Sequence, residues 1–458
     1  MILLATNWSN VGMQALQFIL SFSILVTLHE LGHFLTARWF KCRVEKFYLF
    51  FNPWFSLWKK KIGETEYGLG WVPFGGYVKI SGMIDESMDK EQMKQPAQPW
   101  EFRSKPAWQR LIIMLGGVTV NVLLAFVIFI MIMWVWGENY IPVSKLKYGL
   151  YVDSLGKKMG LQDGDNIIAV AGKPIEKYGS VGSEMIMNEA KTVTILRDGQ
   201  QMDLNVPPGT IRQLNKNRLG GLATIRFPQV IDTTQKWVIY KSAEHFRHGD
   251  TVIALNDYPI HFITDQFNSD FQKEIKKTLV LNYKVVRNGH DTVTVTLQRN
   301  PDHDSAFGTV PMPPDSILGY THIPYSLTEA IPAGIHKAGE TLGNYIRNLK
   351  LLFTSKEVKA QDSLGSVISI AGIFPGLWDW ESFWMLTGIF SILLAFMNVL
   401  PIPALDGGHA LFTLVEMISG RKPSDKFIEY AQMVGMILLF SLMAYAIGLD
   451  IFHLFGRK

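Results

Sequence analysis

Four long apolar stretches dominate the pattern of hydrophobic and polar positions along the chain. They run over residues 11–37, 111–136, 383–405 and 430–449. Each is long enough to cross the hydrocarbon core of a bilayer as a helix, which takes about 20 residues. A shorter apolar piece, 366–378, contains a proline and is predicted to be interfacial or re-entrant. The pattern therefore predicts a polytopic α-helical membrane protein with about four transmembrane helices.

Basic residues beside these stretches predict their orientation. Lys and Arg gather after the first stretch, before the second, and between the third and fourth, whereas the segment before the first stretch has none. Cytoplasmic loops carry an excess of basic residues, so the 41–110 and 406–429 loops are placed in the cytoplasm. Both chain ends and the long 137–382 region then lie outside.

Composition narrows the class of protein further. Of 458 residues, 48% are hydrophobic and only 18% are charged, which fits a membrane protein with a sizeable soluble part. The formal net charge is +4 and no basic run indicates nucleic-acid binding. The single cysteine, Cys42, excludes an internal disulfide and a cysteine-based zinc site.

The outer region contains a weak internal repeat over residues 150–300. Gly164–Asp165 in the first copy matches Gly249–Asp250 in the second. Each copy continues with a strand, a turn at Asp198–Gly199 or Asn288–Gly289, and a return strand. This pattern resembles the PDZ domain, which takes an extended peptide as an added strand. Two interpretations stay open: the copies bind peptide, or they exclude bulky substrates by size alone.

The loops and domain bounds follow from these features. Tyr148–Ser154 is the nearest candidate for the carboxylate-binding loop of the first PDZ-like copy. Residues 68–82, punctuated by Gly and Pro, predict a β-hairpin that offers Trp71, Phe74, Tyr77 and Val78 for apolar contact. The predicted domains are 1–136 (two transmembrane helices and the cytoplasmic hairpin), 137–225 and 226–300 (PDZ-like α+β/β domains), 301–382 (linker and interfacial segments) and 383–458 (two transmembrane helices).

The first apolar stretch carries the candidate chemistry, in the sequence HELGH. His29 and His33 are spaced i, i+4, which places both imidazoles on one face of a helix where they can share a zinc ion. Glu30 can then act as a general base toward the hydrolytic water. Ionisable residues within a membrane span are costly and usually functional. A metal centre is therefore preferred over a polar patch that only hydrogen-bonds another helix.

Two histidines leave a zinc site short of a protein ligand, and the candidate is Asp406 in the sequence LDGG. The first and third spans run in the same direction through the membrane. His29 and His33 lie in the cytoplasmic half of the first span, and Asp406 lies at the cytoplasmic end of the third. Similar depth is what a shared metal requires, so the predicted site lies near the cytoplasmic side.

HELGH in the first span, with NxxPxxxLDGG in a later one, resembles the site-2 protease family of intramembrane zinc proteases. The resemblance covers essentially the whole chain. It implies Zn²⁺ held by His29, His33 and Asp406, with Glu30 as catalytic base. Asn398 would hold the substrate backbone, unless it only caps its helix before Pro401. His409 follows the motif and is expected to act behind the ligands or to lie at the surface.

Two further elements follow from the resemblance. Gly117 and Asn121 belong to a GxxxN element in the second span, where Asn121 either contacts substrate or bridges helices. The resemblance implies that the 68–82 element is a membrane-associated β-hairpin. It is expected to bind an unwound substrate as an edge strand, because a transmembrane helix hides its peptide groups in its own hydrogen bonds.

The implied substrates are single-span membrane proteins, notably an anti-sigma factor and remnant signal peptides, cut after a prior trimming step. The implied setting is regulated intramembrane proteolysis in a stress response, at the inner membrane of a bacterium with the PDZ pair in the periplasm. Two alternatives stay open: a catalytically inactive membrane PDZ scaffold, and a metal transporter that uses the same ligands as a path.

Overall fold

The computed structural model describes residues 8–83, 95–217, 220–233, 245–267, 271–272, 275, 278–298, 311–319, 321–363 and 365–455. Contacts divide the chain into two compact units. Unit 1 contains Met1–Gly137, Pro324–Leu349 and Leu364–Lys458, and unit 2 contains Glu138–Ile323 and Lys350–Ser363.

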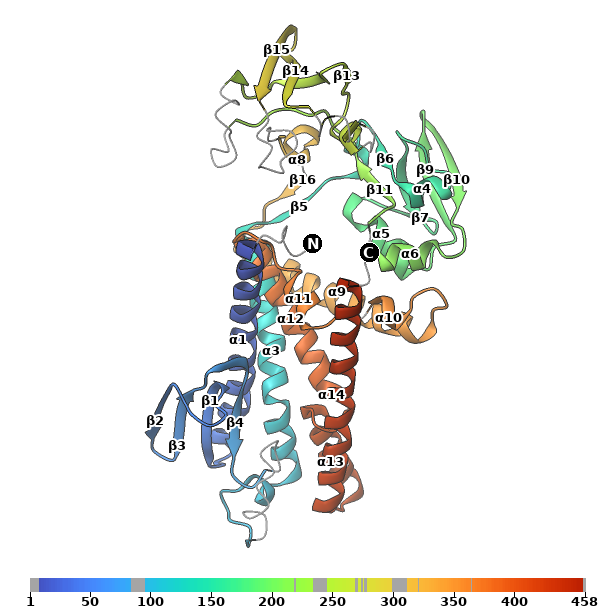
Figure 1. The fold of residues 1–458 in the computed structure, drawn as a ribbon. Coiled ribbons are helices and arrows are strands. Elements are labelled where there is room, and N and C mark those ends of the chain that lie inside the picture. The colour runs from blue at the N-terminus through green and yellow to red at the C-terminus, as the bar shows by residue number, and fades with distance from the viewer. Residues whose placement is uncertain are drawn as a thin grey trace. The chain divides into compact units, whose positions relative to one another are not determined.

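Long helices form the frame of unit 1 (Figure 1). Four of them are long and apolar enough to cross a membrane, which confirms the predicted number of candidate spans. The second of these, α3, packs against α1, α12 and α13. The helices of this unit are α1 (Trp8–Trp39), η2 (Phe102–Ser104), α3 (Ala107–Val135), α9 (Leu327–Thr354, shared with unit 2), α11 (Val367–Ala371), α12 (Trp380–Val399), α13 (Asp406–Ser419) and α14 (Asp425–Phe455).

The third candidate span is shorter than its apolar stretch. Helix α12 ends at Val399, and residues 400–405 are not helical. Pro401 and Pro403 explain the end, because proline lacks the N–H that a continuing helix needs and disfavours helical geometry in the preceding residue. Asp406 is therefore the first residue of a separate helix, α13, and not the last turn of the span.

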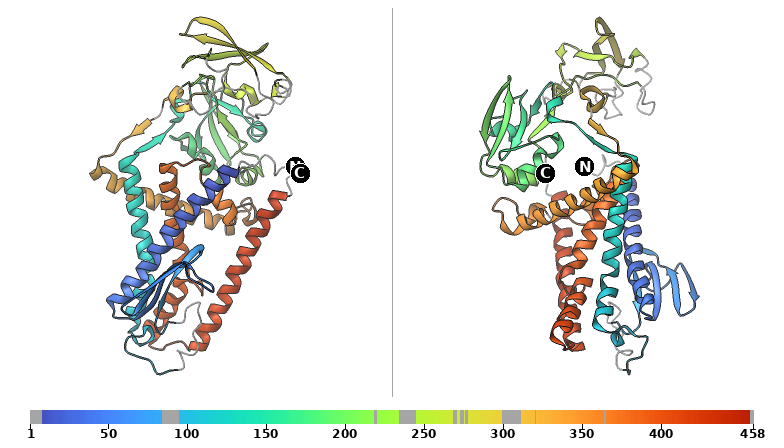
Figure 2. Two further views of the ribbon diagram at one scale, coloured as in Figure 1. Left: turned by 60° about the vertical axis from the view of Figure 1, so that its left-hand side comes forward. Right: turned by 180° about the vertical axis from the view of Figure 1, so that it is seen from behind.

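A four-stranded sheet lies beside α1, as Figures 1 and 2 show. Its strands are β1 (Val44–Phe51), β2 (Trp58–Ile62), β3 (Thr65–Leu69) and β4 (Val72–Ile80), in the order β2-β3-β1-β4. Strand β1 is parallel to β3 and antiparallel to β4. The prediction of a hairpin over residues 68–82 is therefore wrong, because β1 lies between β3 and β4, the two strands that the hairpin would have paired.

The glycines that suggested this hairpin have another role. A Cβ on Gly68 would lie 2.2 Å from the Tyr48 ring, and one on Gly76 would lie 2.7 Å from the Tyr48 carbonyl oxygen. Both distances are far below ordinary van der Waals contact. These glycines let β1 pass closely between its neighbours, which local turn signals do not reveal.

Unit 2 contains two four-stranded sheets with the same connectivity. The first has the order β10-β9-β7-β8 and the second β13-β12-β14-β15, which is the same arrangement read from the other end. Two-stranded pairs, β11-β6 and β16-β5, complete the unit. The strands are β5 (Glu138–Tyr140), β6 (Leu150–Val152), β7 (Asn166–Val170), β8 (Lys173–Pro174), β9 (Thr192–Arg197), β10 (Gln200–Asn205), β11 (Ala223–Ile225), β12 (Thr251–Leu255), β13 (Tyr258–Pro259), β14 (Val280–Arg287), β15 (Asp291–Gln298) and β16 (Thr321–Ile323).

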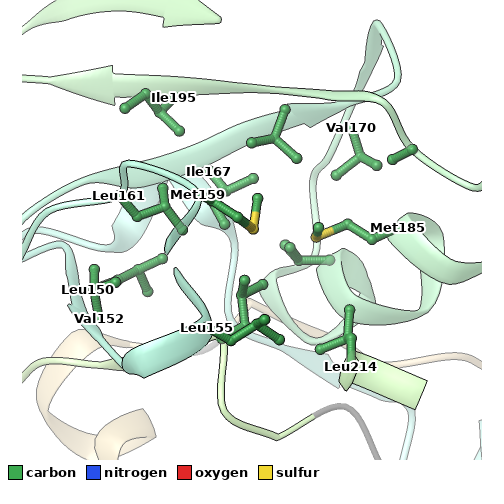
Figure 3. Close-up of a cluster of buried hydrophobic side chains, with 14 of the residues drawn as sticks. Leu150, Val152, Leu155, Met159, Leu161, Ile167, Val170, Met185, Ile195 and Leu214 are labelled. Atoms are coloured by element: carbon green, nitrogen blue, oxygen red, sulfur yellow. The ribbon is translucent and has the colours of Figure 1, made fainter. Parts of the chain in front are cut away.

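Unit 2 also contains short helices, and each copy has its own apolar core. Figure 3 shows the first core, where side chains from β6, α4, β7, α5, β9 and α6 point toward one another. A second, separate cluster lies within the second copy. The helices are η3 (Val143–Lys145), α4 (Ser154–Lys158), η4 (Tyr178–Ser180), α5 (Val181–Met187), α6 (Thr210–Lys216), η6 (Ile263–Phe267), α8 (Pro314–Leu318) and α10 (Ala360–Ser363).

The repeat predicted from the sequence is present in the hairpins. Strands β9 and β10 pair across Asp198–Gly199, and β14 and β15 pair across a turn that begins at Asn288–Gly289. All four turn residues have positive φ. Asn, Asp and Gly tolerate that conformation, which matches the twist of the flanking strands.

An ion pair between a buried aspartate and a partly buried arginine is also repeated. In the first copy, the guanidinium of Arg197 donates to both oxygens of Asp165, at 2.8 and 2.7 Å. In the second copy, Arg287 donates to both oxygens of Asp250, at 2.9 and 2.7 Å. Hydrogen bonding to Arg287 and to the Arg247 N–H lowers the pKa of the Asp250 carboxyl despite its burial. The PDZ assignment itself stays a prediction.

The loop predicted to bind a peptide carboxylate has no free strand edge. One edge of β6 pairs with β11. On the other edge, the Leu150 N–H donates to the Asp165 carbonyl at 3.0 Å, and the Val152 N–H donates to Asp163 Oδ1 at 2.7 Å. A peptide cannot add as a strand to Tyr148–Ser154 in this arrangement.

Candidate metal centre

Three donor side chains from two segments far apart in the sequence meet in unit 1. His29 and His33 lie one turn apart on α1, and both are buried. Asp406 begins α13, which packs on α3 beside α1. Within the described part of the chain, these three form the one group of histidine, cysteine or acidic residues whose ligand atoms lie close enough to hold a metal.

The glycines after Asp406 make this approach possible. A Cβ on Gly407 would lie 2.2 Å from the Leu400 carbonyl oxygen, and one on Gly408 would lie 2.6 Å from the Ile402 carbonyl oxygen. The start of α13 therefore folds back tightly on the segment that follows α12. Only residues without a side chain allow this turn, which explains the two glycines of LDGG.

The three donor atoms form a nearly equilateral triangle. His29 Nε2 and His33 Nε2 are 3.2 Å apart. Asp406 Oδ2 lies 3.1 Å from the former and 3.3 Å from the latter. Ligands at about 2.05 Å from a tetrahedral zinc ion lie about 3.3 Å from one another. The spacing thus fits the separations that a tetrahedral zinc site requires.

The environment of Asp406 supports the same fit. Its Oδ2 atom is buried, and no N–H or O–H in the described part of the chain donates a well-formed hydrogen bond to it. A buried carboxylate oxygen that accepts no well-formed hydrogen bond is costly. A cation bound between Oδ2 and the two imidazoles would remove that cost, so the residues present fit zinc.

Helix α3 forms the wall behind the imidazoles. A Cβ on Gly117 would lie 2.5 Å from His33 Nε2 and 2.6 Å from His29 Cε1, so only glycine leaves room for both rings. One turn away, the Ile113 carbonyl oxygen lies 2.8 Å from His33 Nδ1. That contact keeps the ring hydrogen on Nδ1 and leaves the Nε2 lone pair free for a metal.

The two candidate asparagines both contact His29, but at opposite ends of its ring. Asn121 Nδ2 lies 3.2 Å from His29 Nδ1, behind the donor atoms. Asn398 Nδ2 lies 3.3 Å from His29 Nε2, among them. Asn398 is therefore at the front of the site, where a substrate would lie, and Asn121 is at the back.

Glu30 connects the centre to the sheet. The backbone N–H of Val78 on β4 lies close enough to the Glu30 carboxylate to interact with it. Strand β4 is an outer strand of its sheet, so an edge of β4 faces the candidate base. Among the predicted substrate-contacting residues of this element whose side chains the structure describes, Val78 is the one that lies next to Glu30.

The other predicted sheet residues have different surroundings. Tyr77 stacks on Tyr48 and donates its hydroxyl to Asn52 Oδ1 at 3.0 Å. Burial raises the pKa of Tyr77 to about 12, so this hydroxyl stays protonated. Trp71 stacks on Phe55 and is partly exposed. Phe74 belongs to β4, and its side chain lies outside the described part of the structure.

His409 lies apart from the ligands. Its Nε2 is 2.6 Å from Gln432 Nε2 on α14. It also lines a small cavity of about 50 Å³ together with Arg110 and Glu416, which form an ion pair.

The contacts of Ile113 and Gly117 with the imidazoles were not predicted. Their only signal in the sequence is the four-residue spacing that they share with Asn121.

These observations define a polytopic membrane protein with a candidate metal centre on its apolar helices. The pattern of Peptidase family M50, the site-2 proteases, matches residues 17–442. The chain belongs to this family and is a zinc metallopeptidase.

Three relatives illustrate the match over nearly the whole length. A "Putative zinc metalloprotease" of Thermotoga maritima is 24% identical and covers 96% of this chain and 99% of its own. A protein of the same description from Rickettsia conorii is 27% identical, with 96% and 98% covered. The "Regulator of sigma E protease" of Haemophilus influenzae is 26% identical, with 95% and 98% covered.

Proposed function

We propose that this protein is an intramembrane zinc endopeptidase that cleaves single-span membrane proteins. The observation that carries the proposal is the triangle of His29 Nε2, His33 Nε2 and Asp406 Oδ2, with sides of 3.1 to 3.3 Å, built on helices that are apolar enough to span. Glu30, next to His29 on α1, supplies a carboxylate beside it.

Each of these residues has its own role in the proposed hydrolysis. His29, His33 and Asp406 hold zinc, which when bound polarises the scissile carbonyl and lowers the pKa of water towards about 7. Glu30 takes a proton from the attacking water and passes it to the leaving amine. Asn398 donates its amide N–H to the substrate backbone and keeps the peptide at the donor atoms.

The edge of β4 offers a way to hold the substrate open. A helical substrate hides its peptide groups, and cleavage needs one segment unwound. Because the Val78 N–H lies near Glu30, a segment added as a strand along β4 would pass close to the base. Strand addition supplies affinity through backbone hydrogen bonds, so it accepts varied sequences.

Unit 2 is proposed to select the substrates. Its two copies act as a periplasmic PDZ pair that admits substrates already trimmed by another protease, while the active site lies near the cytoplasmic side of a bacterial inner membrane. The name of the Haemophilus relative supports an anti-sigma factor as one substrate. Remnant signal peptides are the second class, because they too are short single spans.

Substitution of the base tests the proposal. Glu30→Gln keeps the shape of the side chain but cannot accept the proton, so cleavage of a single-span reporter in detergent should fall by about 100-fold or more. Zinc content is measured in the same preparation and should stay at the wild-type value. Unchanged cleavage by Glu30→Gln with zinc bound would show that the assigned base is wrong.

A further inference from the structure

Three residues of α3 face the two imidazoles as a ridge. Ile113, Gly117 and Asn121 follow one another at four-residue spacing, so they lie on one face of the helix. Ile113 contacts the outer nitrogen of His33, and Gly117 lies beneath both rings. Asn121 contacts the outer nitrogen of His29. Each imidazole therefore has its own partner on the side away from the donor atoms.

The two partners differ in chemistry. The Ile113 carbonyl can only accept, so it fixes the ring hydrogen of His33 on Nδ1. The side-chain amide of Asn121 can either accept or donate. Its Nδ2 faces His29 Nδ1 at 3.2 Å, while its Oδ1 is buried without a hydrogen-bond partner among the described residues.

The orientation of this amide decides whether His29 can bind a metal. When Nδ2 donates to His29 Nδ1, the ring hydrogen lies on Nε2 and blocks the donor atom. A half-turn of the amide brings Oδ1 to Nδ1 at nearly the same position, because the two ends of an amide have almost the same shape. Nδ1 then carries the hydrogen and donates it, and the Nε2 lone pair becomes available to a metal.

We propose that Asn121 is a positioning residue for the metal centre, and that its Oδ1 accepts the Nδ1–H of His29 when zinc is bound. This role rests on the proposed metal centre. Asn121 has no exposed surface, so it acts on the back of the His29 ring. It orients the ring and keeps the ring hydrogen on Nδ1, while Asn398 lies at the opposite end of the ring, next to Nε2.

The residue is itself held from the neighbouring helix. Ser391 on α12 donates its hydroxyl to the Asn121 backbone carbonyl at 2.8 Å, and both residues are fully buried. That bond joins α3 to α12 without touching His29. It separates a general packing role of this position from the specific role of its side-chain oxygen.

The test is the zinc dissociation constant of the full-length protein in detergent, measured by competition with a chromophoric chelator. Asn121→Leu has no acceptor and should weaken zinc binding about 10- to 100-fold. Asn121→Asp keeps an acceptor of the same size and should bind zinc as tightly as the wild type or more tightly. Ser391→Ala should leave zinc affinity unchanged, because the hydroxyl does not reach the ring.

The outcomes separate this inference from the proposed function. Wild-type affinity in Asn121→Leu, or equal losses in the Leu and Asp variants, would overturn the role of Asn121 and leave the metal centre intact. A wild-type protein that binds no zinc would overturn the metal centre and the inference with it. If Asn121→Leu does not fold, the smaller Asn121→Ala carries the same expectation.

Discussion

Gly117 is the position where one added carbon should disrupt the metal centre. It lies on α3 directly beneath His29 and His33. Gly117→Ala adds only a methyl group inside a helix, where alanine is favoured over glycine by roughly 0.5–1 kcal/mol. The substitution therefore acts on the site and not through loss of helix propensity.

The structure gives the size of the disturbance. The new Cβ would lie 2.5 Å from His33 Nε2 and 2.6 Å from His29 Cε1, whereas ordinary contact begins at 3.4 Å. The rings must therefore move away by roughly 1 Å, several times the tolerance of about 0.2 Å for metal–ligand distances. We expect zinc affinity to fall by at least about 100-fold, at or beyond the upper end of what loss of an orienting partner costs.

The assay is zinc competition on purified Gly117→Ala, with cleavage of a single-span reporter in parallel. Gly12→Ala is a matched control, because Gly12 lies on α1 with His29 and its added Cβ would meet no atom within 4 Å. That variant should bind zinc and cleave as the wild type does. Wild-type zinc affinity in Gly117→Ala would refute the packing of the imidazoles on α3.

Three further outcomes follow. Asp250→Asn should lower the unfolding free energy of unit 2 by about 2 kcal/mol at neutral pH, because it removes the charge of a buried carboxylate that accepts two hydrogen bonds from Arg287. Pairing lowers the pKa of Asp250, so the stability that the ion pair contributes is present above about pH 4 and is lost as pH falls through that lower pKa. The unfolding free energy of the variant should therefore depend less on pH in the acid range than that of the wild type. Contrary evidence would be the same pH dependence in both. Val78→Pro removes the N–H that reaches Glu30 and should cut reporter cleavage about tenfold or more with zinc content unchanged; equal cleavage rates would exclude this contact. Deletion of 150–300 should allow untrimmed substrates to be cut, and if they stay intact the size filter lies elsewhere.

Local signals predicted the parts of the site that depend on local geometry. HELGH needs only helical spacing to bring His29 and His33 together. Asp406, more than three hundred residues away in the sequence, was reached by the direction of the spans and by family resemblance. The repeated hairpins were also predicted, because Asp-Gly and Asn-Gly turns set their register locally.

Non-local pairing was not visible in the sequence. The insertion of β1 between β3 and β4 turned glycines that looked like turn residues into points of close approach at Gly68 and Gly76. Helix α9 was missed because it carries charged residues and an internal proline, Pro332, and so is not a long apolar stretch. The contact of Val78 with Glu30 depends on how the sheet lies against α1, which no local pattern encodes.

The central claim is that His29, His33 and Asp406 bind one zinc ion together. The most direct test measures the zinc content of the purified full-length protein and records its X-ray absorption spectrum at the zinc edge, which reports the ligands. We expect about one zinc per chain with two imidazole ligands and oxygen donors, and a large loss of zinc in Asp406→Ala. A wild-type protein without zinc, or wild-type zinc content and an unchanged absorption spectrum in Asp406→Ala, would contradict the claim.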